Sequence, residues 1–220
     1  CLTCYKPFYD FLREKCGISD VFQAFYEEDV DRDTDVLFSV GGDGTFLDSA
    51  MRVKNHGVPV LGINSGRLGF LANIAQEEIP QAIHWLCAGD FDVEQRALVK
   101  FEMKDNPFAE FNYALNEISV LKTERSSLLK VHAYIGEEYL TTYWADGVIV
   151  ATPTGSTAYS LSCGGPIVAF GCDNLIITPV SPHNLNMRPL ILPGNVQIRL
   201  KVESRSGDFM LSADSRMQRM

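Results

Sequence analysis

The stretch that decides the fold is Asp35-Val36-Leu37-Phe38-Ser39-Val40-Gly41-Gly42-Asp43-Gly44-Thr45, followed by Phe46-Leu47-Asp48-Ser49-Ala50-Met51. The apolar run predicts a strand, the glycines predict a turn, and the apolar spacing after them predicts a helix. Such a turn aims backbone N–H groups and the positive end of the helix dipole at an anion. The carboxylate of Asp43 would repel a phosphate oxygen, so it fits better beside a hydroxyl proton or a metal-bound water. The pattern therefore suggests phosphoryl transfer to an alcohol.

The glycine turn differs from two better-known phosphate-binding loops. A P-loop requires a Gly-Lys-Ser/Thr ending, and no lysine occurs between Gly41 and Met51. A dinucleotide fingerprint starts well at Gly42 and Gly44, but its third glycine position is occupied by Leu47. The alternative for this stretch is an ordinary strand-to-helix turn, with glycine supplying a positive φ and Asp43 acting as a local cap.

The composition limits the classes of partner. Acidic residues outnumber basic residues 28 to 19, and the 220-residue chain has a formal net charge of −9. This balance disfavours nucleic acid or an anionic membrane surface as the main partner, but it leaves nucleotide binding open. No apolar stretch approaches the length of a membrane span, so we expect no membrane partner. The six cysteines lack the spacing of a disulfide framework, and we expect reduced thiols in a cytoplasmic protein.

Residues 1–93 alternate between strand and helix signals. Apolar spacing predicts a helix over residues 8–12, and a second apolar run, 58–63, leads into the polar glycine loop Asn64-Ser65-Gly66-Arg67-Leu68-Gly69-Phe70. Residues 77–88 predict another helix, with Ile79, Ile83 and Leu86 on one stripe and Gly89 as its end. This is βαβ construction. We therefore predict an α/β domain with a Rossmann-like parallel sheet and ligands at the C-terminal ends of its strands.

Residues 94–220 instead show the period-2 alternation of antiparallel strands, as in 131–135 and 196–203. A further strand, 146–151, runs into the hydroxyl-rich segment 152–162 and then Gly164-Gly165-Pro166. Serine and threonine favour helix N-caps, so capping alone could account for this segment. Five serine or threonine hydroxyls within nine residues exceed what capping needs, and this favours a ligand loop over 152–166. We predict an all-β domain carrying one short helix.

Several motifs together resemble the NAD kinase family, in family order and over roughly residues 35–215. They are Gly41-Gly42-Asp43-Gly44-Thr45, Asn64-Ser65-Gly66-Arg67-Leu68-Gly69-Phe70-Leu71, Asn116-Glu117, Asp146-Gly147, Thr152-Pro153-Thr154-Gly155-Ser156-Thr157-Ala158-Tyr159-Ser160-Leu161-Ser162, Gly164-Gly165-Pro166, Pro182-His183 and Arg188-Pro189. The first motif alone also resembles diacylglycerol and sphingosine kinases. The Asn-Glu pair and the long hydroxyl-rich motif separate the chain from those.

The resemblance implies transfer of the γ-phosphoryl group of ATP to the adenosine-ribose 2′-hydroxyl of NAD, giving NADP. It implies Mg²⁺ or another divalent cation as a cofactor that enters with ATP, and Asp43 as the catalytic group. A positioned carboxylate suits that role, because the attacking alcohol must lose its proton. The resemblance also implies a homodimer or homotetramer, and polyphosphate is an alternative phosphoryl donor.

The remaining site residues are carried over from the family motifs as nucleotide contacts. They are Gly42, Asp43, Gly44, Thr45, Phe70, Asn116, Glu117, Asp146, Thr157, Ala158, Tyr159, Ser160, Leu161, Ser162 and His183. Several of these residues also fit a purely structural role. Phe70 and Tyr159 can be core aromatics, and the Asn-Glu pair can be an ordinary strand-end turn.

Two other functions remain open at this point. One is a lipid kinase that shares the glycine-turn motif, and the other is an NAD(P)-sensing module without catalysis. The chain also departs from the family near its C-terminus. Where the family reads Ser-x-Asp-Gly-Gln, this chain reads Ser212-Ala213-Asp214-Ser215-Arg216.

Overall fold

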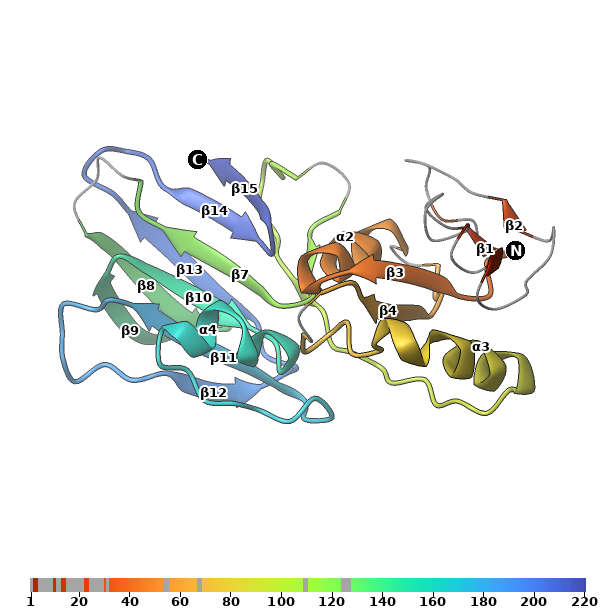
Figure 1. Ribbon diagram of the computed structural model, residues 1–220. Coiled ribbons are helices and arrows are strands. Elements are labelled where there is room, and N and C mark those ends of the chain that lie inside the picture. Colours follow the sequence, from red (N-terminus) through yellow and green to blue (C-terminus); the bar gives the residue numbers. More distant parts are fainter. Residues whose placement is uncertain are drawn as a thin grey trace. The chain divides into compact units, whose positions relative to one another are not determined.

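The computed structural model describes residues 32–53, 56–66, 69–108, 111–123 and 128–220, with residues 2–3, 10, 13–14, 22–23 and 30 before them. The chain forms two compact units, an N-terminal unit (Cys1–Glu94) and a C-terminal unit (Gln95–Met220) (Figure 1). Most of the helix predicted over residues 8–12 lies outside the described residues. The domain assignment of residues 1–93 and 94–220 stays a prediction.

Parallel strands and short connections organise the N-terminal unit. Strands β3 and β4 pair in parallel from Leu37↔Val60 to Gly41↔Asn64, so both end at the same edge. Gly89 ends the last helix with φ at 72°, and the N–H of Asp90 donates to the carbonyl of Trp85 to close its final turn. The elements are β1 (Leu2–Thr3), β2 (Phe22–Gln23), β3 (Leu37–Gly41), α2 (Asp43–Val53), β4 (Val60–Asn64), η1 (Gln76–Glu78) and α3 (Ile79–Ala88).

Strand β3 is covered on both faces. Leu37 packs with Val53 at the end of α2, whereas Phe38 packs with Ile63 and with Ile79 of α3. Successive side chains of a strand point to opposite faces, so α2 and α3 lie on opposite sides of the sheet (Figure 1). This arrangement is the α/β fold expected from the continuous apolar run.

The C-terminal unit is a β-sandwich. A six-stranded antiparallel sheet has the order β12-β11-β10-β7-β14-β15, and a three-stranded sheet has the order β13-β8-β9. The strands are β5 (Val99–Lys100), β6 (Tyr113–Ala114), β7 (Glu117–Leu121), β8 (Leu129–Ile135), β9 (Glu138–Ala145), β10 (Gly147–Ala151), β11 (Asn174–Val180), β12 (Leu190–Pro193), β13 (Ile198–Glu203), β14 (Met210–Ala213) and β15 (Arg216–Arg219). Two short helices follow β10, namely η2 (Thr154–Thr157) and α4 (Tyr159–Ser162).

Strand β10 is the centre of this unit and is buried along its whole length. Val148 and Val150 belong to the core between the two sheets, whereas Ile149 and Ala151 face the segment that contains Val168. Figure 1 shows α4 on this second side of the large sheet. The strand therefore delivers the hydroxyl-rich segment directly from the most buried part of the sandwich.

The predicted fold class is confirmed, with an α/β unit followed by an all-β unit that carries one short α-helix. The alternation over 131–135 is also confirmed, since Val131 and Ala133 are fully buried. The strand predicted from residue 196 begins two residues later, at Ile198. Within the described residues, no helix has the length and apolar character needed to cross a membrane.

Candidate functional site

The carboxylate of Asp43 holds a second loop in place. Its Oδ1 accepts the N–H groups of Leu71 at 2.9 Å and Ala72 at 3.1 Å, and its Oδ2 accepts the N–H of Phe70 at 3.0 Å. A Cβ atom on Gly69 would lie 2.2 Å from Oδ1. Glycine is required there because the loop passes so close to the carboxylate. Asp43 thus joins the glycine turn to residues 69–72.

The glycines of the turn are not accounted for by positive φ. Positive φ occurs at none of the three glycines Gly41, Gly42 and Gly44. The interpretation that this turn needs glycine for its backbone angles is therefore wrong. At Gly41 a Cβ would overlap the side chain of Thr45, so close packing requires that glycine. At Gly42 and Gly44 a Cβ would meet no atom within 4 Å. The protein itself leaves the space over these two glycines open.

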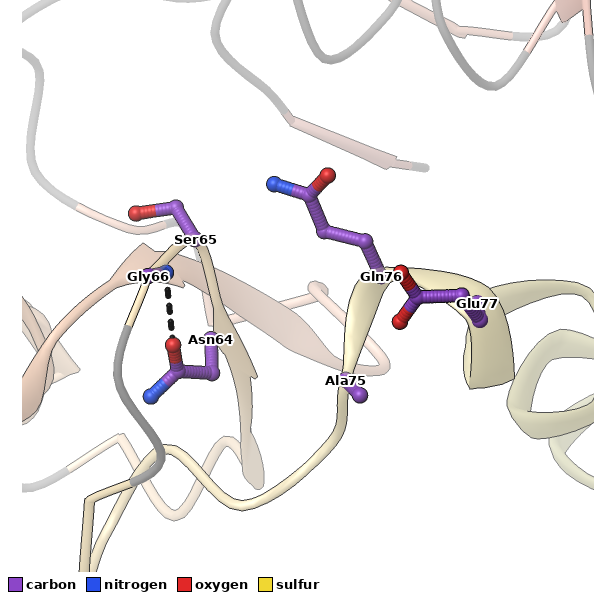
Figure 2. Close-up of a pocket in the computed structure, with 6 residues that line it drawn as sticks. All are labelled: Asn64, Ser65, Gly66, Ala75, Gln76 and Glu77. Carbon is purple, nitrogen blue, oxygen red and sulfur yellow. Dashed lines mark hydrogen bonds between the residues drawn. The ribbon is translucent and has the colours of Figure 1, made fainter.

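The end of β4 completes this part of the site. Asn64 is buried, with its Oδ1 accepting the N–H of Gly66 at 2.7 Å and its Nδ2 donating to the carbonyl of Ala72 at 3.2 Å. The N–H of Ser65 donates to the carbonyl of Gly41 at 3.2 Å. Residues 64–66 face Ala75, Gln76 and Glu77 across a polar pocket of about 230 Å³ (Figure 2). The pocket lies at the C-terminal end of β4, where ligands bind in parallel α/β sheets.

Phe70 lies on the loop that Asp43 holds, and 62% of its surface is exposed. The interpretation of Phe70 as a core aromatic is therefore wrong. The N-terminal unit brings Phe70 together with Gly42, Asp43, Gly44 and Thr45 at the end of the parallel strands. An exposed ring next to this glycine turn can pack against a planar ligand group.

In the C-terminal unit, the buried hydroxyls of the hydroxyl-rich segment bond to protein groups. Thr152 donates to the carbonyl of Leu115 at 2.6 Å, and Ser156 donates to the carbonyl of Pro153 at 2.6 Å. The hydroxyl of Ser160 lies 2.8 Å from that of Thr178. Neither η2 nor α4 has a hydrogen bond from its N-cap side chain, but Oγ1 of Thr152 accepts the N–H of Gly155 in η2 at 3.1 Å. Capping therefore accounts for only one of these hydroxyls. The hydroxyls of Thr152 and Ser160 attach the segment to the sandwich, whereas that of Ser156 closes a turn within it.

The outward-facing residues of this segment are the ones left for a ligand. Tyr159 and Leu161 are each 38% exposed, which excludes the interpretation of Tyr159 as a core aromatic. Ser162 is exposed, and Thr157 and Ala158 are half-buried. Ser160 is fully buried, so it supports the segment from inside. The ligand-binding role of each residue stays a prediction.

Glu117 has an unusual electrostatic environment. Burial, together with the nearby charge of Asp214, raises the pKa of its carboxyl from 4.5 to about 7, while a backbone hydrogen bond from Tyr159 acts in the opposite direction. Its Oε2 is buried without a hydrogen-bond partner among the described residues. A half-buried carboxyl with one buried oxygen that lacks a partner among the described residues is an expensive arrangement unless a ligand completes it. Neighbouring Asn116 is also buried.

Other titratable groups lie near Glu117. Burial raises the pKa of the Tyr159 hydroxyl, and so do Cys163, Asp146 and Glu117, which places these groups around the same ring. Asp146 is half-buried and forms an ion pair with Lys122, with Oδ1 and Nζ 2.7 Å apart. The structure therefore gathers four of the predicted residues of this unit, Asn116, Glu117, Asp146 and Tyr159.

His183 is a separate case. It is exposed, and its backbone N–H donates to the carbonyl of Trp144 at 2.7 Å. Ser181, two residues earlier, has φ at 45°. No contact of the His183 side chain with the other predicted residues is recorded in the described part of the chain.

Three residues at the site have roles that the sequence did not reveal. Lys122 pairs with Asp146, and Asp214 and Arg216 bond to the segment that carries Asn116 and Glu117. The signal for Asp214 and Arg216 was their place in the stretch that corresponds to the family's Ser-x-Asp-Gly-Gln. Lys122 had no such signal.

Comparison with known proteins gives a single family. Residues 14–91 match the ATP-NAD kinase N-terminal domain and residues 115–219 match the ATP-NAD kinase C-terminal domain. An NAD kinase of Flavobacterium psychrophilum is 44% identical over 215 residues, which cover 96% of this chain and 73% of the relative. An NAD kinase of Cytophaga hutchinsonii is 47% identical over 184 residues, covering 84% of this chain and 63% of that protein.

Two solved structures share the fold. Yeast NADH kinase complexed with NADH has a TM-score of 0.76 and 37% identity, covering 84% of this chain and 55% of that one. An NAD kinase from Archaeoglobus fulgidus in complex with ATP has a TM-score of 0.81 and 24% identity, covering 99% of this chain and 85% of that one.

Proposed function

This chain belongs to the NAD kinase family, and we propose that it phosphorylates NAD by transferring the γ-phosphoryl group of ATP to the adenosine-ribose 2′-hydroxyl. The product is NADP. The lipid-kinase and sensing-module alternatives are not favoured, because the curated relatives that match over most of the chain are NAD kinases. The one observation that carries the chemistry is the fixed carboxylate of Asp43 beside an open glycine turn.

Asp43 is suited to accept the hydroxyl proton. An ionised carboxylate offers about four lone-pair positions, and the backbone N–H groups at residues 70–72 occupy two on Oδ1 and one on Oδ2. One position on Oδ2 is left for the 2′-hydroxyl. The backbone bonds also hold the carboxylate in one orientation, which removes the cost of orienting it during the reaction.

The open space over Gly42 and Gly44 is suited to phosphate oxygens. These residues lie at the start of α2, an 11-residue helix whose N-terminal N–H groups favour an anion. Exposed Phe70 offers a ring for the adenine. In the C-terminal unit, Asn116 and Glu117 are suited to ribose and base groups.

The cofactor and the assembly belong to the same proposal. We expect Mg²⁺ or another divalent cation to enter with ATP, where it would neutralise charge on the transferred phosphoryl group. Within the described residues, no group of three or more His, Cys, Asp or Glu side chains forms a metal site. Mg²⁺ needs no such group, since it is commonly held by substrate phosphates, water and one or two carboxylates. A homodimer or homotetramer in the cytoplasm remains our expectation.

A direct assay tests the function. The purified chain is incubated with NAD, ATP and Mg²⁺, and NADP is quantified with an NADP-specific dehydrogenase. Parallel reactions contain diacylglycerol or sphingosine with labelled ATP. NADP formation that depends on ATP supports the proposal. Label that appears only in lipid, or tight NAD binding without any NADP, would reject it.

A further inference from the structure

We propose that Asp214 and Arg216 form a clamp that positions Asn116 and Glu117 for nucleotide binding. Both residues come from the hairpin of β14 and β15, and both bond to the backbone of residues 111–117. They are positioning residues, because they act through the Asn-Glu pair. This inference rests on the proposed function, which supplies the nucleotide.

Asp214 holds the end of the segment that enters β7. Its Oδ2 accepts the N–H of Leu115 at 2.8 Å, and its Oδ1 accepts the N–H groups of Asn116 at 2.8 Å and Glu117 at 3.2 Å. The N–H of Asp214 in turn donates to the carbonyl of Glu117 at 3.0 Å. Asp214 has φ at 51°, a conformation that aspartate tolerates better than most residues. One side chain thus satisfies three successive N–H groups.

Arg216 holds the other end of the segment. Its guanidinium donates from Nη1 to the carbonyl of Phe111 at 2.7 Å and from Nη2 to the carbonyl of Tyr113. It also lies over the rings of Phe108 and Phe111, with its Cζ 5.1 and 5.7 Å from their centroids. The planar fork of arginine can reach two carbonyls at once and stack on aromatic rings. The glutamine of the family motif has neither the charge nor the full fork.

The same short segment contacts the predicted nucleotide loop on its other side. The carbonyl of Leu115 accepts the hydroxyl of Thr152, and the carbonyl of Asn116 accepts the N–H of Thr152 at 2.9 Å. A Cβ on Gly155 would lie 2.0 Å from the carbonyl of Asn116, so the loop and the segment are in close contact. The clamp binds the N–H groups of residues 115–117 while the loop binds the carbonyls. A shift of the segment therefore moves the Asn-Glu pair relative to the loop.

Charge links the clamp to Glu117. Burial is the main cause of the raised pKa of Glu117, and the charge of Asp214 adds to it. Burial also raises the pKa of Asp214, while its backbone hydrogen bonds and the charge of Arg216 act in the opposite direction. The other groups that face Glu117 are the hydroxyl of Tyr159 and the thiol of Cys163, both from the α4 region. The clamp thus holds Glu117 in position and contributes, after burial, to the pH at which it ionises. A residue with a merely structural role would leave that pH unchanged.

The test uses Arg216→Gln, Arg216→Lys and Asp214→Asn in the full chain. The matched control is Arg219→Gln, since Arg219 lies on the same strand and bonds to Asp208 on the surface. The Michaelis constant for NAD, kcat and the unfolding temperature are measured from pH 5.5 to 8.5. We expect Arg216→Gln to raise KM about tenfold with little change in kcat, Arg216→Lys to recover part of the loss, and the control to match wild type.

The pH profile separates positioning from folding. Removing the charge of Asp214 favours ionised Glu117, so the transition near pH 7 in kcat/KM should move to lower pH in Asp214→Asn. If Asp214→Asn does not fold, the KM of Arg216→Lys and Arg216→Gln decides. Wild-type KM in both arginine variants, or an unmoved pH profile in a folded Asp214→Asn chain, would overturn the clamp. Absence of NADP with the wild-type chain would instead reject the proposed function.

Discussion

Replacing Asp43 by asparagine separates the two tasks of this side chain. The variant keeps the size of the side chain and one oxygen, which can still accept the N–H groups of Leu71 and Ala72. It replaces Oδ2 by an amide nitrogen, which cannot accept the N–H of Phe70 or a proton from the substrate hydroxyl. Loss of Oδ2 therefore removes the proton acceptor together with one of the three loop bonds, while Oδ1 keeps the other two.

The two effects differ in size. Loss of a general base typically lowers turnover by about 10²–10⁴-fold, so kcat should fall by at least about a hundredfold. A hydrogen bond to a charged group contributes about 1.5–3 kcal/mol, but water can replace part of it at the exposed Phe70. We expect a remaining loss of about 1 kcal/mol in nucleotide binding, which is about a fivefold rise in KM. Turnover should therefore suffer more than binding.

The assay is a steady-state measurement of NADP formation with NAD and ATP varied separately, accompanied by thermal unfolding. Asp48→Asn is the matched control, because Asp48 lies exposed on the same helix. The control should keep wild-type kcat and KM. An Asp43→Asn chain that folds and turns over at the wild-type rate would refute the general-base role. An Asp43→Asn chain with normal kcat but raised KM would show that Asp43 only holds the loop of residues 69–72 in place.

Three further predictions test neighbouring features. Glu117→Gln should match the wild-type free energy of unfolding at pH 4.5 and exceed it at pH 8 by up to about 3 kcal/mol, measured by urea unfolding. The reason is that the raised pKa of Glu117 stabilises the fold fully below about pH 4.5, and this contribution is lost as the pH rises to about 7. Equal stability of the two chains at pH 8 would contradict the raised pKa of this carboxyl. Gly44→Ala should stabilise helix α2 by about 0.5–1 kcal/mol, because its Cβ meets no protein atom within 4 Å. The same Cβ would intrude on a bound phosphate, so the KM for nucleotide should rise. An unchanged KM would argue against a phosphate subsite at Gly44. Gly69→Ala should lower the free energy of unfolding by about 1–3 kcal/mol, because its Cβ overlaps the Asp43 carboxylate. Gly66→Ala is the control, since its Cβ meets no atom within 4 Å, and its free energy of unfolding should stay within about 0.5 kcal/mol of wild type. Equal effects of the two substitutions would refute the close contact.

Local patterns were enough to predict the elements. The apolar run before Gly41 is β3, the helix after it is α2, and the helix closed by Gly89 is α3. These predictions held because periodicity, glycine conformation and helix ends depend on neighbours within a few residues. Local pattern could not show which hydroxyls of the segment 152–162 attach it to the sandwich, as those of Thr152 and Ser160 do. Their partners come from distant segments, such as Thr178.

The sequence alone was sufficient to place the glycine turn after a buried strand and to identify its resemblance to a kinase family. Only the tertiary structure decided what the charged groups contact. The carboxylate of Asp43 bonds to N–H groups 27–29 residues away, and that of Asp214 to N–H groups 97–99 residues away. Such pairings, and the burial that raises the pKa of Glu117, arise when distant segments pack together and lose water. No local period encodes them.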